Sequence, residues 1–241
     1  MKLDSEERVI ESNIVGKNID FRIANTGHMQ DILRKSMYSD PIGSICREIS
    51  DNARDANREA GNKHIPVEIW VPGTDLIIKD DGLGISPARM EEIFSVYGES
   101  SKRDTNEQGG GFGLGAKTPF AYTDSFGIET VHKGQYYLYL AYINEDKCSQ
   151  LKVVEQRSAE TSEKSGTKII IPVKPRDRNE FSRKIIEYTK YWFIAGDTPP
   201  KLLGAIPESP DVILRGDNWI ILKPSGPRIL CNGIPNSLDE N

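Results

Sequence analysis

Hydrophobic positions in the first third of the chain recur at three- and four-residue spacing. Between residues 41 and 60 this spacing predicts an amphipathic helix. Its apolar face carries Ile42, Ile45, Cys46, Ile49, Ala53, Ala56 and Ala60. Asp40 suits the N-cap, Pro41 suits the first helical position, and Gly61 suits the end of the helix.

Alternation of apolar and polar residues predicts strands through most of the remaining chain. The expected strands are 8–15, 19–23, 67–71, 76–79, 126–132, 135–143, 150–156, 167–173, 212–214 and 219–222. Further helices are expected near 28–37, over 87–96 with Ser86 as the cap, and over 177–193. Helical patterns early and adjacent strands late predict an α/β (α+β) two-layer sandwich, with helices on one face of a mixed, mainly antiparallel sheet.

Composition narrows the class of protein. With 37% hydrophobic and 28% charged residues among 241, the chain is expected to be soluble, with one domain over 1–175. A helix plus short strands over 176–241 would begin a following domain or form a C-terminal extension. No apolar run approaches the ~18 residues of a membrane span, and the first residues lack the apolar core of a signal peptide, so a cytoplasmic location is expected.

Cysteine usage and net charge exclude further classes. Cys46, Cys148 and Cys231 are far apart and form no CxxC pair, which argues against a disulfide framework or a zinc site. A net charge of −5 gives no general attraction to nucleic acid.

Glu48, Asn52 and Asp55 form a polar stripe along the helix predicted over 41–60. Their i, i+4, i+7 spacing places them roughly a quarter-turn from the apolar face. We expect an acid, an amide and a second acid at the edge of the core, without a basic partner among them. A solvated helix face is the ordinary interpretation of such a stripe.

Two glycine-containing segments bear on this stripe. Asp80-Asp81-Gly82-Leu83-Gly84 follows a predicted buried strand, and a carboxylate fixed there suits recognition of an amine on a flat ring. A simple Asp-Gly turn is the alternative. QGGGFGLGAKTPF, which begins at Gln108, contains five glycines and suits backbone N–H groups that surround phosphate oxygens before a helix N-terminus. A flexible loop is the alternative there.

In this order, the acid–amide helix, the Asp-x-Gly-x-Gly segment and the glycine-rich segment resemble the GHKL ATPases, which include gyrase, Hsp90, histidine kinases and MutL. The resemblance implies a Bergerat fold that holds ATP and Mg²⁺ under a mobile lid. It implies that Glu48 is the general base, that Asn52 is the magnesium ligand and that Asp80 binds adenine. The other implied binding residues are Gly82 and Gly84 beside Asp80, Gly110, Gly111, Gly113 and Gly115 at the phosphates, and Thr167, which supports Asp80 through water.

Asp55, Asp51 and Lys117 lie next to these motifs. Asp55 faces the same way as Glu48, and we interpret it as a group close to the nucleotide, whereas Asp51 leans off this face and is interpreted as structural. Lys117 follows the last glycine and either reaches a phosphate or is a solvated lysine at a helix start. The sequence leaves both alternatives open.

A narrower resemblance involves GGFGLGAKTPFAYTDSF, with YGESSK before it and HKG after it. These stretches are similar to the N-terminal region of the rIIA-like proteins of tailed phages. That resemblance implies a role in phage–host interaction in the host cytoplasm, with peripheral association at the inner membrane. GHKL relatives couple lid closure to dimerisation, so a homodimer or a protein partner is expected.

These features predict a magnesium-dependent ATPase, slow or dependent on a partner, that acts as an ATP-driven conformational switch. One alternative is a non-catalytic nucleotide-binding interaction module. Another is a histidine-kinase-type catalytic domain, although those kinases typically carry Asn where Glu48 stands. Gyrase and MutL complete the γ-phosphate site with a lysine from a second domain, and no lysine after Thr167 can be assigned that role.

Overall fold

The computed structural model describes residues 27–36, 38–95 and 115–202, with strand segments at 212–215, 220–222, 228–231 and 234–237. Several sequence predictions lie outside these residues and stay predictions. They are the strands at 8–15 and 19–23 and the phosphate-binding glycines Gly110, Gly111 and Gly113.

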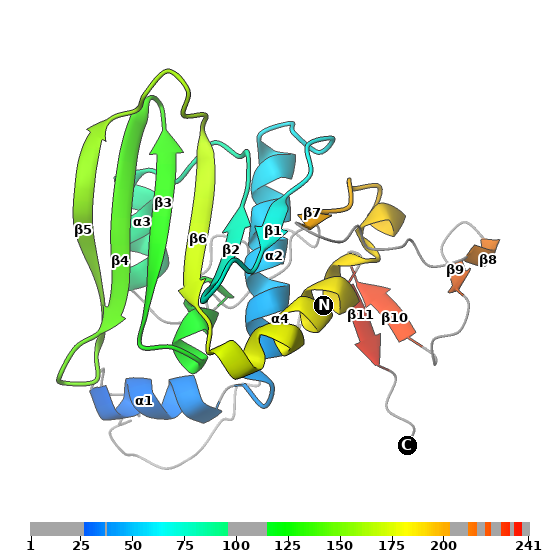
Figure 1. The fold of residues 1–241 in the computed structure, drawn as a ribbon, viewed down its shortest axis with the longest axis horizontal. Helices are drawn as coiled ribbons and strands as arrows, with labels where there is room; N and C mark the ends of the chain where they lie inside the picture. The colour runs from blue at the N-terminus through cyan, green and yellow to red at the C-terminus, as the bar shows by residue number, and fades with distance from the viewer. Residues whose placement is uncertain are drawn as a thin grey trace, which may run out of the picture.

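A seven-stranded mixed sheet forms one layer of the fold (Figure 1). In spatial order its strands are β5 (Ser149–Ser158), β4 (Gln135–Ile143), β3 (Ser125–His132), β6 (Gly166–Pro172), β2 (Asp75–Lys79), β1 (Glu68–Trp70) and β7 (Lys201–Leu202). Every neighbouring pair is antiparallel except β1 and β7, which are parallel. The predicted mixed, mainly antiparallel sheet is confirmed.

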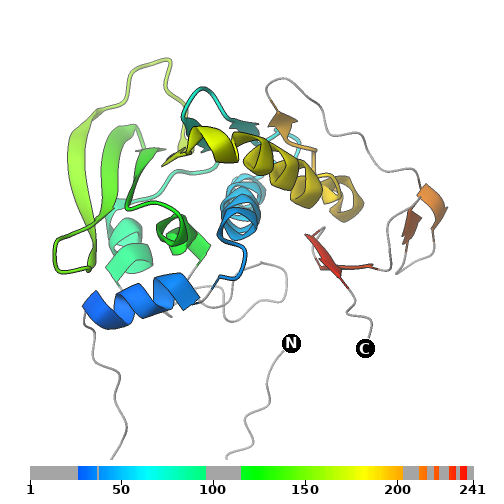
Figure 2. The ribbon, with the colours of Figure 1, turned by 60° about the horizontal axis from the view of Figure 1, so that its bottom comes forward.

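Helices form the second layer, and Figure 2 shows the first three α-helices on one side of the sheet. The α-helices are α1 (Gly27–Ser36), α2 (Pro41–Glu59), α3 (Pro87–Ser95) and α4 (Arg178–Thr189). Short 3₁₀ helices are η1 (Gly115–Ala121), η2 (Pro175–Asp177) and η3 (Trp192–Ala195). The two-layer α/β fold class is therefore confirmed.

Helix α2 begins at Pro41, as its sequence predicts, and ends at Glu59, one residue before the predicted end. The Asp40 side chain accepts a hydrogen bond from the Gly43 N–H at 2.8 Å, and Pro41 occupies the first turn, where no N–H is needed. Gly61 follows the helix with φ of +74°, a conformation that favours glycine. Both ends of α2 are thus fixed by local sequence.

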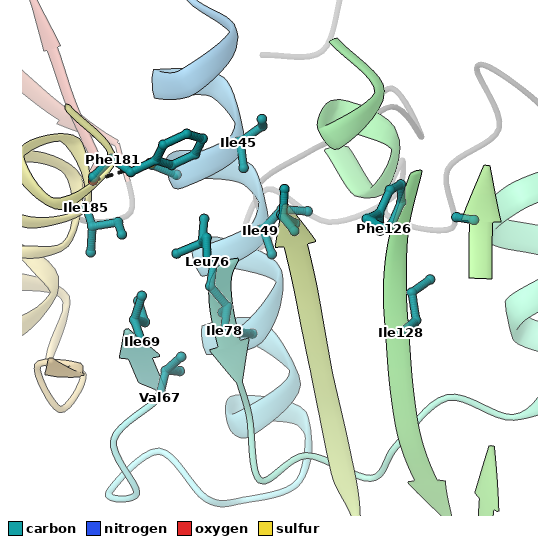
Figure 3. Close-up of a cluster of buried hydrophobic side chains, with 14 of the residues drawn as sticks. Ile45, Ile49, Val67, Ile69, Leu76, Ile78, Phe126, Ile128, Phe181 and Ile185 are labelled. Atoms are coloured by element: carbon teal, nitrogen blue, oxygen red, sulfur yellow. Dashed lines mark hydrogen bonds between the residues drawn. The ribbon is translucent and has the colours of Figure 1, made fainter. Parts of the chain in front are cut away.

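The hydrophobic core lies between α2 and the sheet (Figure 3). Its buried side chains include Ile45 and Ile49 from α2, Leu76 and Ile78 from β2, Phe126 and Ile128 from β3, and Phe181 and Ile185 from α4. Burial of each such side chain contributes about 1.5–3 kcal/mol to stability. This packing sets the position of the polar stripe on α2 relative to the ends of the strands.

Helix α4, which lies between β6 and β7 in the sequence, packs against the first half of the chain. Cys46 Sγ on α2 donates to the Phe181 carbonyl of α4 at 3.7 Å, and Lys184 Nζ lies 2.6 Å from an Asp40 carboxylate oxygen. The helix predicted over 177–193 is shorter than expected, because α4 ends at Thr189 and η3 follows. The division of the chain at 175 and 176 stays a prediction.

Two short antiparallel pairs of strands follow β7 in the sequence. They are β8 (Val212–Arg215) with β9 (Ile220–Leu222), and β10 (Arg228–Cys231) with β11 (Ile234–Ser237). Within the described ranges, no helix has both the length and the apolar character needed to cross a membrane.

Candidate functional site

The acid and amide of the α2 stripe meet the end of the glycine-rich segment. Gly115 begins η1, and a Cβ built on it would lie 2.8 Å from Glu48 Oε2 and 3.6 Å from Asn52 Nδ2. Glu48 and Asn52 are both partly buried. Within the described residues the Asn52 side chain makes no hydrogen bond, so its amide is available to a ligand.

The stripe itself contains no basic residue, but its acids pair with arginines elsewhere on α2. Arg47 Nη2 lies 3.0 Å from Glu48 Oε1, and Arg58 Nη1 lies 3.5 Å from Asp55 Oδ1. Asp51, which we interpreted as structural, pairs in the same way with Arg54 at 2.6 Å. Arginines at adjacent or i+3 positions reach these carboxylates because their long stems extend across the helix surface.

Asp55 belongs to a buried network of charges. Arg58 Nε donates to Asp197 Oδ1 at 2.8 Å, and a second, shorter contact joins Arg58 Nη2 to Asp197 Oδ2. The hydrogen bond with Asp197 raises the pKa of Arg58 above its ordinary value. Asp55 and Asp197 are 3% and 6% exposed, so the network is buried. It joins α2 to the segment after η3 through the contact of Arg58 with Asp197. The proximity of Asp55 to a nucleotide stays a prediction.

Asp80 lies at the end of β2, with one carboxylate oxygen fixed by two backbone groups. Its Oδ1 accepts from the Gly82 N–H at 2.9 Å and from the Thr167 N–H at 3.0 Å. Oδ2 makes no hydrogen bond within the part of the chain that the structure describes. Burial raises the pKa of Asp80 to about 7, and the two backbone hydrogen bonds oppose part of that rise.

The glycines after Asp80 allow this loop to approach its neighbours closely. A Cβ on Gly82 would lie 2.8 Å from Asp80 Oδ1 and 2.9 Å from the Cβ of Ala56 on α2. Gly84 has φ of +70°, and a Cβ there would lie 2.0 Å from the Val131 carbonyl oxygen. Both glycines are therefore required by the packing of the loop between α2 and β3.

Thr167 lies beside Asp80, and its support of Asp80 through water stays a prediction. Thr167 also has a partner that the sequence does not indicate. Thr167 Oγ1 lies 3.2 Å from the hydroxyl of Thr130 on β3. The Thr130 hydroxyl also accepts from the Ile85 N–H at 2.8 Å and lies 3.1 Å from the Gly166 carbonyl. Thr130 therefore links the far end of the loop that carries Asp80, at Ile85, to the start of β6, and only the fold places it there.

Lys117 is 5% exposed and makes an interaction within the protein, so the solvated alternative is wrong. The segment that carries it differs from the expected helix. Because Pro119 interrupts α-helical hydrogen bonding, Gly115–Ala121 form a seven-residue 3₁₀ helix. Contact of Lys117 with a phosphate stays a prediction.

Asn57 is a further residue of this region that sequence reasoning missed. Its side-chain oxygen accepts from the Asp81 N–H at 2.8 Å, directly beside Asp80. The sequence does contain a sign of this role, because Asn57 stands four residues after Ala53 and thus falls on the apolar face of the predicted helix. Such a buried amide needs hydrogen-bond partners, and the loop after Asp80 supplies one.

This arrangement fits a nucleotide with its metal ion. An accepting carboxylate oxygen suits an exocyclic amine, and an amide oxygen suits a hard cation whose other ligands are phosphate oxygens and water. Asn52 is the residue here that would supply the amide oxygen. Among the described residues, no group of three or more His, Cys, Asp or Glu side chains could hold a metal ion.

Comparison with known proteins agrees with this geometry. No curated protein matches the chain. The family model for histidine kinase-, DNA gyrase B- and HSP90-like ATPases matches residues 37–177, more than half of the chain. The matched range contains α2, Asp80, Gly115 and Thr167. The chain therefore belongs to the GHKL-type ATPase family.

Proposed function

We propose that this protein binds ATP with Mg²⁺ and hydrolyses it slowly. The observation that carries the proposal is the position of α2, which contacts both parts of the site. Gly115 lies against Glu48 and Asn52, and Gly82 lies against Ala56 one turn later. Four residues of helix span about 6 Å, so α2 sets the spacing between a base-binding end and a phosphate-binding end.

Each polar group has a role in this proposal. Asp80 Oδ2 accepts a hydrogen bond from the exocyclic amine of adenine. Asn52 contributes its amide oxygen to Mg²⁺, and the nucleotide phosphates supply the negative charge. Glu48 Oε2, on the side of Gly115, orients and deprotonates the water that attacks the γ-phosphate. Backbone N–H groups of the glycine-rich segment surround the phosphates, with Lys117 nearby.

A non-catalytic nucleotide-binding module is the second candidate, and one contact favours it. Arg47 Nη2 lies 3.0 Å from Glu48 Oε1, where the guanidinium competes with a water molecule for that carboxylate oxygen. The opposing observation is that the pair leaves Oε2 facing Gly115. A histidine-kinase-type domain is less favoured, because a water-activating Glu48 would waste the phosphoryl group.

Phosphate release and calorimetry with the same protein test the two candidates. Glu48→Ala should leave ATP affinity nearly unchanged and lower turnover by about 10²–10⁴-fold, as expected for loss of a general base. Glu59→Ala, an exposed glutamate at the end of the same helix, is the matched control and should leave turnover unchanged. Turnover by Glu48→Ala at the wild-type rate would favour the non-catalytic module.

Selectivity for the base tests the assignment of Asp80. ATP should bind more tightly than GTP, because guanine presents a carbonyl oxygen where adenine presents an amine. Asp80→Asn should weaken ATP binding, since the amide can offer a donor where a carboxylate only accepts. Equal affinity of the wild-type protein for ATP and GTP would contradict the role of Asp80.

We propose a wider role on sequence similarity alone. The similarity to rIIA-like phage proteins supports an ATP-driven conformational switch in phage–host interaction, in the host cytoplasm and peripheral to the inner membrane. Nucleotide-dependent association with a second copy or a protein partner belongs to the same proposal. Sedimentation of the protein with and without a non-hydrolysable ATP analogue tests the self-association.

A further inference from the structure

Two asparagine side chains hold the residue that follows Asp80. Asn57 Oδ1 accepts from the Asp81 N–H at 2.8 Å, and Asn62 Nδ2 donates to the Asp81 carbonyl at 2.6 Å. The other end of the Asn57 amide donates to the Ile65 carbonyl at 3.0 Å. Both backbone groups of Asp81 are therefore engaged by side chains, and both ends of the Asn57 amide are engaged by backbone.

This arrangement determines where the Asp80 carboxylate points. Asp80 Oδ1 accepts from the Gly82 N–H, which lies on the far side of Asp81. Rotation of the peptide between Asp81 and Gly82 would break the bond to Asn62 and move the Gly82 N–H away from Asp80. Rotation of the peptide that joins Asp80 to Asp81 would break the bond to Asn57. The orientation of the carboxylate thus depends on the two asparagines.

Asn57 also connects this loop to the helix of the acid–amide stripe. It is 2% exposed and lies on α2 five residues after Asn52, about 7.5 Å along the helix axis. Its neighbour Ala56 is in close contact with Gly82. Movement of the loop relative to Asn52 is therefore limited by a hydrogen bond and by packing at adjacent positions of one rigid helix.

We propose that Asn57 is a positioning residue for adenine selectivity, because it holds the backbone of Asp81 so that Asp80 presents its free oxygen to the base. This inference rests on the proposed ATP binding. Loss of the Asn57 bond would shift the carboxylate relative to the base, while the contacts of Glu48 and Asn52 with Gly115 would remain. Buried polar groups held at fixed positions discriminate between ligands more strongly than they contribute to general affinity.

Calorimetry with Mg-ATP and Mg-GTP, at pH 8 where Asp80 is ionised, tests this inference. Asn57→Ala should lower the ratio of ATP to GTP affinity about tenfold, the equivalent of one lost hydrogen bond at a buried site. The GTP affinity should change less than the ATP affinity. A structural defect that unfolds part of the sample would lower both affinities equally and leave the ratio unchanged.

Asn144→Ala is the matched control. Asn144 Oδ1 also accepts a backbone N–H at 2.8 Å, from Cys148 in the turn between β4 and β5, away from the Asp80 loop. This variant should keep the wild-type ratio. The thermal transition shows whether Asn57→Ala folds. If it does not fold, Asn62→Ala replaces it in the test, because this variant removes the contact with the Asp81 carbonyl and changes a less buried residue.

Asn62→Ala should lower the ratio in the same direction as Asn57→Ala. If folded Asn57→Ala keeps the wild-type ratio of ATP to GTP affinity, the positioning role is overturned. If Asn57→Ala does not fold, the same result in Asn62→Ala overturns it. That result would leave the proposed ATP binding intact. Failure of the wild-type protein to prefer ATP would instead refute the proposed function itself, so the two failures are distinguishable.

Discussion

Asp80→Asn should stabilise the unliganded protein, and the gain should be larger at alkaline pH. Burial raises the pKa of the Asp80 carboxyl from 3.8 to about 7, so its ionised form is unfavourable in the folded state. The asparagine keeps a side-chain oxygen that can accept from the N–H groups of Gly82 and Thr167. The variant thus removes the ionisation while it retains both hydrogen bonds.

The size of the effect follows from the pKa shift. Because the folded pKa is raised, the stability linked to protonated Asp80 is fully present below pH 3.8 and is lost as pH rises through about 7. Above pH 7 the rise of the pKa from 3.8 to about 7 corresponds to about 4 kcal/mol of lost stability, whereas at pH 5.5 only about 2 kcal/mol has been lost. The gain from Asp80→Asn should therefore grow by about 2 kcal/mol between pH 5.5 and pH 8, or roughly 4–8 °C in Tm.

Calorimetric or fluorescence melts of both proteins at the two pH values measure this difference. Subtraction of the wild-type Tm at each pH removes the contribution of the other titrating groups. Addition of ATP at about 100 times Kd should stabilise the wild-type protein by about 2.7 kcal/mol and the variant by less. A Tm difference that is the same at pH 5.5 and pH 8 would refute the conclusion that ionised Asp80 destabilises the fold.

Three other substitutions test the surroundings of the site. Gly84→Ala should lower Tm more than Gly134→Ala, because both have φ near +70° but only the Cβ at 84 meets backbone, and equal losses would contradict the close packing of the loop. Asp197→Asn should destabilise the protein, and a double-mutant cycle with Arg58→Met should give a coupling energy of about 1–3 kcal/mol, whereas coupling near zero would show that the buried pair contributes little. Arg47→Ala should raise ATP turnover severalfold by freeing Glu48 Oε1, and a fall in turnover would instead assign Arg47 to phosphate binding.

Sequence reasoning succeeded where structure depends on neighbouring residues. The start of α2 follows from Asp40 and Pro41, and strands β1 and β2 follow from the alternation of apolar and polar residues over 67–71 and 76–79. The position of Asp80 at a strand end follows from the same alternation. Caps, turns and periodicity act within about one helical turn or one strand, so they can be read from a short stretch of sequence.

Sequence reasoning failed where a residue's partner is distant or where two local preferences compete. Asp197 stands 139 residues after Arg58, and no local pattern joins them. Thr130 contacts Thr167 only because β3 and β6 are adjacent in the sheet. The expected helix after the glycines is a 3₁₀ helix because Pro119 lies inside it. The fold alone decides such contacts.

The polar residues of α2 fall into two groups, the buried acids that pair with arginine and the groups that face the end of the glycine-rich segment. Burial of an unpaired carboxylate is costly, and Asp51 and Asp55 are both buried beside arginines three residues later. Asn52 has no side-chain hydrogen bond within the described residues, and Glu48 keeps Oε2 toward Gly115. The acids that pair with arginine thus allow a highly charged helix to enter the core. The amide and the remaining carboxylate oxygen are the groups of α2 that this structure leaves for a ligand.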